Sequence, residues 1–256
     1  MRRRHTLSYS ISIVFIMLLC VDTLCAQNDS IAKINENVTI GAKNETTTVK
    51  LKYGLRLGID TGKLIRTALD DNYKAMELVA DYRITKKLYI AGEIGNEEKI
   101  NTTDFLDVTT SGTYFKAGID YNLYQNWLDM DNMVYFGSRV GISAFNHTIN
   151  EYTIYSTNQY WQQRNVTQAT EKTGLTAAWL ELIIGIKAEL FTNLYFGLNA
   201  QLKILVTETQ PDNFQNIFIP GFNKTYDSTR IGVGYGYTIS YRIPLYKKEK
   251  PVVPVK

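Results

Sequence analysis

The chain has 256 residues, and its 28 lysine and arginine residues against 25 aspartate and glutamate residues give a formal net charge of +3. So small a charge excludes the basic surface of a nucleic-acid-binding protein, and we expect no nucleic acid as a partner. Hydrophobic residues make up 45% of the chain, and 18 tyrosines stand against 5 prolines. This balance excludes a disordered chain and is typical of a protein rich in β-strands.

Residues 1–26 have the layout of a secretory signal peptide. Three arginines and a histidine follow the first methionine, and an apolar run from Ile11 to Cys20 comes next. This run is too short for a spanning helix, and we expect cleavage after Ala26. Cleavage removes both cysteines, so the exported chain would have no disulfide and no thiolate for catalysis or metal binding.

From residue 51 onward, apolar residues alternate with polar residues or glycine, which is the pattern of a β-strand with one apolar face. In the stretch 51–60 every apolar side chain stands at an odd position. No run of about 18 uncharged apolar residues follows the signal peptide, so helical membrane spans are excluded. Seven further stretches share the alternating pattern, near residues 75–84, 88–95, 113–123, 133–145, 176–190, 194–207 and 229–243.

The two faces of these strands differ in charge and in glycine content. The apolar face carries no charged residue, whereas the other face carries nearly all of the strand charges and almost all of the strand glycines. Missing side chains make room on the crowded concave side of a curved sheet. We therefore expect the charged face inside and the apolar face outside, where it needs lipid.

Short and long connections alternate between the expected strands. Those after the second and sixth strands have three residues each, at 85–87 and 191–193. Long connections follow the odd-numbered strands, at 61–74, 96–112, 146–175 and 208–228. Short periplasmic turns, long outer loops and an even number of strands are typical of outer-membrane barrels.

The sequence therefore predicts an all-β fold, an eight-stranded antiparallel transmembrane up-and-down β-barrel in the outer membrane. The barrel covers residues 51–243 and closes by pairing of its first and last strands, with outer-membrane lipids around it. A polar leader (27–50) precedes it and a periplasmic C-terminal tail (244–256) follows it.

The last strand resembles the signal by which the outer-membrane assembly machinery recognises a closing strand. That signal has a glycine, an apolar residue three positions on and an aromatic residue two beyond, here Gly236, Ile239 and Tyr241. The resemblance implies that this machinery is a partner.

The barrel region as a whole resembles a family of Gram-negative outer-membrane β-barrels of unknown function. The resemblance implies the fold and the location, and it supplies no activity. It rests on residues 54–60, on 114–123, on 179–181 with Gly185, and on Pro220-Gly221.

An ion-pair network is expected in the interior. The 191–193 turn favours pairing Leu190 with Leu194, and counting back places Glu181 opposite Lys203. Because both lie on the charged face, their side chains should point into the lumen.

The fifth strand would add a second cation to this network. If it pairs with the sixth so that Gly141 faces Trp179, Arg139 lies on the other flank of Glu181. The Glu181 carboxylate should then stay ionised, within about 4 Å of Arg139 or Lys203.

Two long connections carry further expectations. The connection 146–175 is rich in aromatic and amide side chains and fits a flexible surface loop, with a recognition surface for an unidentified ligand as the alternative. Residues 63–69 fit either a short amphipathic helix over the barrel mouth or a simple loop. The aromatic residues singled out for recognition are Tyr152, Tyr155, Tyr160 and Trp161.

Catalytic and metal sites are not expected. His147, the only histidine after the signal peptide, lies four residues from Ser143 near the outer rim, with no acid placed to orient its ring. We therefore expect it to be a surface-loop histidine without partners. One histidine and no cysteine leave only carboxylates for a metal, and residues 129–132 fit a turn better than a calcium loop. No cofactor is expected.

A protein of structural or surface-interaction type is the function that these patterns favour. Eight strands give an interior that side chains fill. The alternatives are a narrow or gated conduit and a lipid-modifying outer-membrane enzyme.

Overall fold

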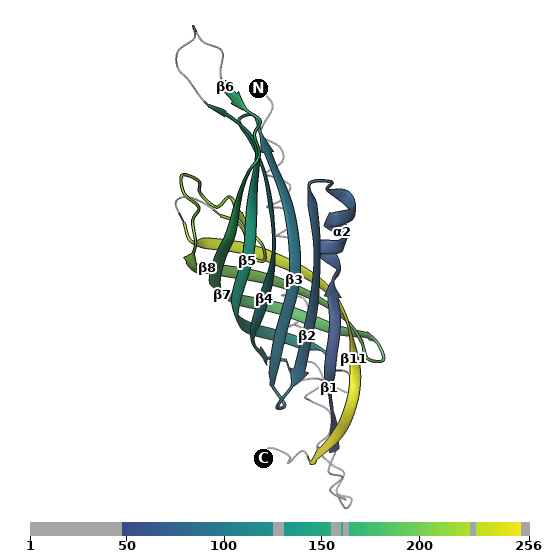
Figure 1. Cartoon of the computed structure of the whole chain (residues 1–256). Coiled ribbons are helices and arrows are strands. Elements are labelled where there is room, and N and C mark those ends of the chain that lie inside the picture. The colour runs from purple at the N-terminus through teal and green to yellow at the C-terminus, as the bar shows by residue number, and fades with distance from the viewer. Residues whose placement is uncertain (1–47, 125–130, 155–159, 161–163, 226–228, 252–256) are drawn as a thin grey trace, which may run out of the picture. The chain divides into compact units, whose positions relative to one another are not determined.

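The computed structural model describes residues 48–124, 131–154, 160, 164–225 and 229–251. Within these ranges eight strands pair antiparallel, each with its neighbour in chain order, and the last pairs back with the first (Figure 1). The predicted up-and-down barrel is confirmed. Its strands are β1 (Thr48–Asp60), β2 (Tyr73–Arg83), β3 (Leu88–Thr103), β4 (Leu106–Asn122), β5 (Met133–Ile154), β7 (Thr170–Phe191), β8 (Leu194–Glu208) and β11 (Ile231–Pro251).

Four short elements complete the described chain. The helix α2 (Thr61–Leu69) follows β1, so the helical alternative for residues 63–69 is the one that the structure adopts. The other three are β6 (Arg164–Val166), β9 (Phe218–Ile219) and β10 (Asn223–Lys224). Among the described residues, no helix has both the length and the apolar character that a membrane span requires.

The register around Glu181 is the predicted one. Glu181 pairs with Arg139 on β5 and with Lys203 on β8. The turn itself differs from the prediction, because Phe191 pairs with Leu194 and a bulge interrupts the register between Glu189 and Phe191. The bulge absorbs one residue at the turn, and the pairing further along the two strands keeps the expected count.

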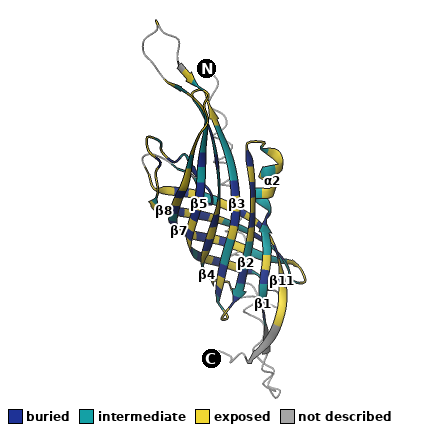
Figure 2. Cartoon of the chain, in the orientation of Figure 1, coloured by how far each residue is buried: buried dark blue, intermediate teal, exposed yellow. Residues whose placement is uncertain are grey.

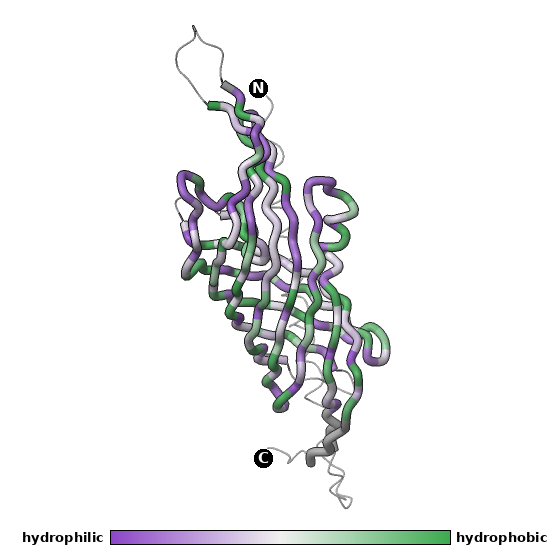
Figure 3. Tube along the Cα trace, viewed as in Figure 1, coloured by the Kyte–Doolittle hydropathy of each residue, from purple (hydrophilic) through white to green (hydrophobic). Residues whose placement is uncertain are grey.

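Burial alternates along the strands, and the charged face lies inside, as predicted (Figure 2). Arg56, Asp120 and Glu181 are at most 2% exposed, whereas Ile184 and Val233 are 65% and 73% exposed. Figure 3 shows polar and apolar residues alternating along the same strands. The polar side chains fill the lumen and the apolar ones cover the outer surface.

Two long connections prove to be largely strand. The expected loop 96–112 is a hairpin in which β3 runs to Thr103 and β4 begins at Leu106, and the expected loop 146–175 consists mostly of the ends of β5 and β7. Alternation did not reveal these parts, because apolar residues become sparse there while backbone pairing continues. We call them the projecting sheet (Figure 1), formed by residues 100–103, 106–110, 147–154 and 170–176.

The barrel boundaries expected at residues 51 and 243 are too narrow. Thr48 pairs with Pro251, so the last residues assigned to the leader and residues 244–251 of the expected tail belong to β1 and β11. The polarity of these segments suggests that their backbone groups are exposed to solvent. Pairing the two ends satisfies these backbone groups with each other instead. The expected signal peptide, the rest of the leader and residues 252–256 lie outside the described residues.

Candidate functional site

The outer surface carries a broad apolar belt. Tyr121 and Tyr241 lie near the short turns and are 43% and 52% exposed. The belt continues around the ring from strand to strand. Its members are Leu57, Met76, Leu78, Ile90, Ile94, Phe115, Ile119, Val134, Phe136, Val140, Ile142, Leu180, Leu182, Ile184, Ile186, Leu202, Ile204, Val206, Val233, Tyr235, Tyr237, Ile239 and Ile243.

In the lumen, near the short turns, Asp131 forms ion pairs with two arginines. Its carboxylate accepts a hydrogen bond from Arg83 at 2.7 Å and another from Arg242. Arg242 also lies 3.2 Å from Glu189. We expected Asp131 in a turn with local hydrogen bonds, and we did not predict that its side chain points into the lumen. Two arginines lie on the inward face at the level of that turn, and they were the sequence feature that could have indicated an inward-pointing Asp131.

The next layer of the lumen is centred on Asp81. It lies 2.5 Å from Arg56 and 2.7 Å from Lys187. The guanidinium of Arg56 also lies between the rings of Tyr89 and Tyr195, at 4.8 Å and 5.1 Å from their centres. Cations and aromatic rings together fill the cross-section at this level.

Lys116 is the centre of the layer above. Its ammonium lies 2.6 Å from Glu93, 3.4 Å from Glu77 and 3.9 Å from Glu181. The side chain is 1% exposed, so three carboxylates from three other strands surround one buried cation. No sequence argument had singled out Lys116.

The predicted partners of Glu181 are wrong, although its inward orientation is right. No ion pair within the described chain joins Glu181 to Arg139 or Lys203. Arg139 lies 2.7 Å from Asp120 instead, and the Trp179 indole donates to Glu181 at 3.1 Å. Residues directly opposite on neighbouring strands have their Cβ atoms about 4.5–5.5 Å apart, and long side chains reach past them to diagonal neighbours.

Helix α2 contributes a further cation from the rim. The Lys63 ammonium lies 2.8 Å from Glu77 and 2.5 Å from Glu97, and it also donates to the hydroxyl of Tyr114. Tyr114 donates in turn to Glu77. The helix is thereby tied to β2, β3 and β4.

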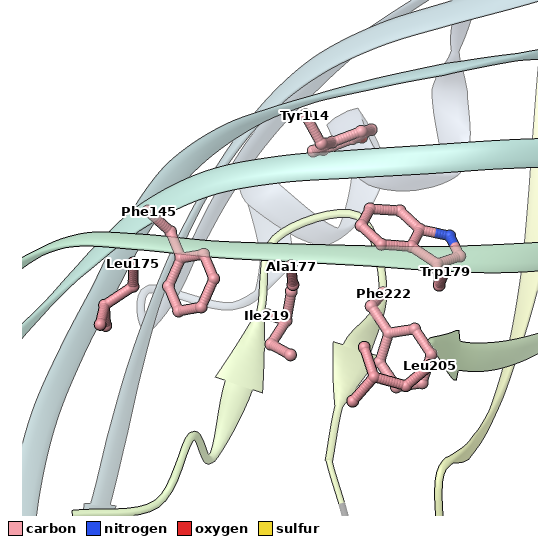
Figure 4. Close-up of a cluster of buried hydrophobic side chains, with 8 residues drawn as sticks. All are labelled: Tyr114, Phe145, Leu175, Ala177, Trp179, Leu205, Ile219 and Phe222. Atoms are coloured by element: carbon pink, nitrogen blue, oxygen red, sulfur yellow. The ribbon is translucent and has the colours of Figure 1, made fainter. Parts of the chain in front are cut away.

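The connection between β8 and β11 turns inward instead of extending away from the barrel. We call its residues 209–225 the plug loop. Ile219 and Phe222 are at most 1% exposed, and Gly221 donates to Glu97 at 2.8 Å and accepts from Lys203 at 2.6 Å. Figure 4 shows the apolar cluster that the loop completes with β4, β5, β7 and β8, formed by Tyr114, Phe145, Leu175, Ala177, Trp179, Leu205, Ile219 and Phe222.

His147 is buried and has partners, so the expected surface-loop histidine is wrong. Its ring nitrogens lie 2.7 Å from the Thr110 hydroxyl and 3.0 Å from Asn216 Oδ1. It lies fourteen residues beyond Met133, the start of β5, which at a tilt of about 40° is about 35 Å along the barrel axis and beyond an apolar band of about 25 Å. Burial lowers the pKa of His147.

Ser143 does not join His147. Its hydroxyl donates to the Thr113 carbonyl at 3.1 Å. Four strand residues separate the two side chains by about 13 Å. The described part of the chain also holds no cluster of three or more metal-binding side chains.

The four aromatic residues singled out for recognition are only partly described. Tyr152 is 37% exposed at the end of β5, and Tyr160 is 96% exposed. Tyr155 and Trp161 lie outside the described residues. On the closing strand, Ile239 and Tyr241 face outward, whereas a Cβ atom added at Gly236 would meet Asn199 at 2.9 Å on the inner side.

These features define a closed eight-stranded β-barrel with an apolar outer surface, a charged interior and an inserted loop. The chain belongs to the family described as Domain of unknown function (DUF6048), which matches residues 6–248. No curated protein matches the chain. Among solved structures it is similar to that of Ail, the attachment invasion locus protein of Yersinia pestis, with 8% identity, coverage of 75% of this chain and 97% of that chain, and a TM-score of 0.38.

Proposed function

We propose that this protein is a Gram-negative outer-membrane barrel of structural or surface-interaction type, which presents its projecting sheet outside the cell. One observation carries the proposal: the lumen is filled by ion-pair layers and a plug loop, while four strands continue past the barrel. The closed part suits anchoring, and the projecting part suits contact.

The apolar belt supports the membrane location. Fully burying one such side chain is worth about 1.5–3 kcal/mol. Leaving the whole belt in water would cost more than the about 5–15 kcal/mol by which a folded domain is stable. Pairing of β1 with β11 closes the ring, so along this seam no strand edge is left unpaired in lipid, which reduces the other obstacle to insertion.

The closing strand supports contact with the outer-membrane assembly machinery. Ile239 and Tyr241 remain accessible on its outer side after closure, at 43% and 52% exposure. Gly236 sits on the same strand at the spacing of the recognition signal.

The geometry disfavours both alternatives. A conduit would have to pass layers in which Lys116, Asp120 and Glu181 are at most 1% exposed. A lipid-modifying enzyme would need a nucleophile and a base that a substrate can reach. The hydroxyl of Ser143 is bonded to the Thr113 carbonyl, and Thr110 and His147, which bond to each other, are fully buried. We therefore propose that the barrel is not an enzyme.

Trypsin added to intact cells tests the topology. It should cut within residues 146–175, which contain Arg164 and Lys172, and should spare Lys86 and Lys87 in the short turn. Cutting at the short turn of sealed cells would reverse the topology. In planar bilayers the purified barrel should give no steady conductance, and a stable conducting state would favour the conduit instead.

A further inference from the structure

The barrel wall has a gap on its outer half, between β2 and β11. Pairing of β1 with β11 ends at Asp60 and Thr238, and pairing of β1 with β2 ends at Ile59 and Leu78. Beyond these pairs, residues 73–77 of β2 pair only with β3, and residues 231–237 of β11 pair only with β8. We call this gap the notch.

Helix α2 fills the notch. Thr61 donates to the Tyr237 carbonyl at 2.8 Å, and the Ala75 amide donates to the Thr67 hydroxyl at 2.9 Å, so two threonines of the helix bond to the two open strand edges. A helix satisfies its own backbone groups and can therefore complete a wall that faces lipid.

The two sides of α2 match this position. Its apolar residues Leu64, Ile65 and Leu69 face outward, at 37%, 59% and 82% exposure. Lys63 reaches the carboxylates of the lumen. The helix thus continues the arrangement of the strands, with its apolar side out and its charge in.

A pocket of about 230 Å³ lies between α2 and the strands β8 and β11. Three cations line it, Lys63, Arg66 and Lys203, together with polar Gln201 and Asn223. None of its lining residues, all of them in the described chain, is acidic. Such a pocket favours an anion.

Lys203 makes no close ion pair with any described residue. Its side chain is 2% exposed and donates to the Gly221 carbonyl at 2.6 Å, and no carboxylate of the described residues lies within 4.0 Å of it. Lys63, by contrast, has Glu77 and Glu97. A buried charge without a close ion-pair partner is costly, and an anion in the pocket would relieve that cost.

Arg66 is the second available cation. Its one ion pair in the described chain is with Asp70, the C-cap residue of α2, at 3.6 Å, and its side chain is 45% exposed. A guanidinium binds phosphate with two parallel hydrogen bonds. Arg66 and Lys203 approach the pocket from the helix and from the barrel wall.

The height of the pocket selects the source of the anion. Lys203 lies nine residues above Leu194, the start of β8, which is about 30 Å along the strand and, at a tilt of about 40°, about 23 Å along the barrel axis. The apolar band of such barrels is about 25 Å tall. The pocket therefore lies at the outer boundary of the belt, where lipid headgroups begin.

We propose that this pocket binds the phosphate group of an outer-leaflet lipid, with Lys203 and Arg66 as its cations. The outward-facing Val233 and Tyr235 at the pocket would contact the acyl chains. The lipid as source rests on the outer-membrane location proposed above, whereas the phosphate site does not.

Native mass spectrometry of the purified full-length barrel in uncharged detergent tests the site. The probes are a phosphorylated glucosamine lipid of the outer leaflet, the same lipid after removal of its phosphates, and inorganic phosphate. Wild-type protein should retain one phosphorylated lipid. Arg66→Gln and Lys203→Gln should each weaken retention by about tenfold or more.

Lys74→Gln is the matched control. It removes a cation of β2 outside the pocket, whose side chain is 68% exposed beside Glu98, so retention should not change. Heat-dependent gel mobility shows whether each variant forms the barrel, and Arg66→Gln, on the exposed helix, is expected to fold even if Lys203→Gln does not.

Equal retention of the dephosphorylated lipid, or unchanged retention in both pocket variants, would overturn the proposal. Binding of inorganic phosphate alone, lost in the same variants, would support the phosphate site and overturn the lipid as its source. Retention of the lipid and binding of inorganic phosphate are both measured in detergent. A negative result in these measurements is therefore distinct from a negative result in the trypsin and conductance tests.

Discussion

The ammonium of Lys63, on helix α2, lies 2.5 Å from the carboxylate of Glu97, on β3. Glu97 is fully buried and also accepts from the Gly221 amide, so one carboxylate connects the helix in the notch to the plug loop. This junction at Glu97 therefore stabilises the rim of the barrel.

Replacing Lys63 with methionine should lower the free energy of unfolding by about 3–5 kcal/mol, because buried Glu97 loses its one ion pair in the described chain and Glu77 keeps only Lys116. Urea unfolding in detergent, followed by tryptophan fluorescence, measures the change. Lys74→Met breaks the exposed pair with Glu98 and should cost less than about 1 kcal/mol. Equal costs for the two variants would show that the junction at Glu97 contributes no special stability.

Lys116 and Glu181 should differ in importance. Lys116→Met leaves three carboxylates around a neutral side chain, and we expect a loss of about 3–5 kcal/mol in unfolding free energy. Glu181→Gln leaves Lys116 with Glu93 and Glu77 and keeps an acceptor for Trp179, so about 1–3 kcal/mol is expected. The same urea titration compares them, and a larger loss for Glu181→Gln would restore Glu181 as the centre of the network.

The stability of the barrel should depend on His147 at mildly acidic pH. Burial lowers the pKa of His147 below its ordinary value of 6.5, so the unfolded chain binds the proton more readily than the folded one. The contribution of neutral His147 is complete above pH 6.5 and declines as the pH falls towards the folded-state pKa. His147→Gln should remove this decline, measured as the difference in unfolding free energy between wild type and variant from pH 5 to 7.

Gly221→Ala should release the plug loop. Gly221 has a φ of +82°, and a Cβ atom there would lie 2.6 Å from Tyr114 Cγ. Gly174 is a matched control, because its φ is +74° but a Cβ atom would meet nothing within 4 Å. Gly174→Ala should cost only the backbone strain of about 1–2 kcal/mol. Limited proteolysis should cut residues 209–225 faster in Gly221→Ala alone, and equal rates would argue against the close contact with Tyr114.

The pairing of Glu181 with Arg139 and Lys203 was predictable, and its ion pairs were not. Side-chain alternation fixes which face a residue occupies, and a three-residue turn limits the register of its hairpin. Neither determines which of several nearby carboxylates a flexible lysine such as Lys116 reaches. That choice depends on the packing of the whole cross-section.

The plug loop was missed for a different reason. Loop length predicts an excursion from the barrel and does not show its direction. The run from Ile217 to Phe222 is uncharged and contains two phenylalanines and two isoleucines, a composition that is more often buried than exposed. That composition was the available signal. No comparable signal indicated that a helix closes the notch. The sequence of residues 61–69 fits a helix over the barrel mouth as well as a helix in the barrel wall.

The pairing of β1 with β11 determines when the barrel can close during synthesis and folding. Leu55 pairs with Ile243, and these residues are separated by 243 − 55 = 188 positions. Contacts so distant in sequence form slowly and late in folding. Because β11 is synthesised after the other seven strands, the Asp131 carboxylate gains Arg242 only once β11 has formed, and the edge of β1 stays open until then. An open edge is a template for pairing with other chains, so the interval between synthesis of β1 and closure of the barrel is when this protein is most exposed to aggregation.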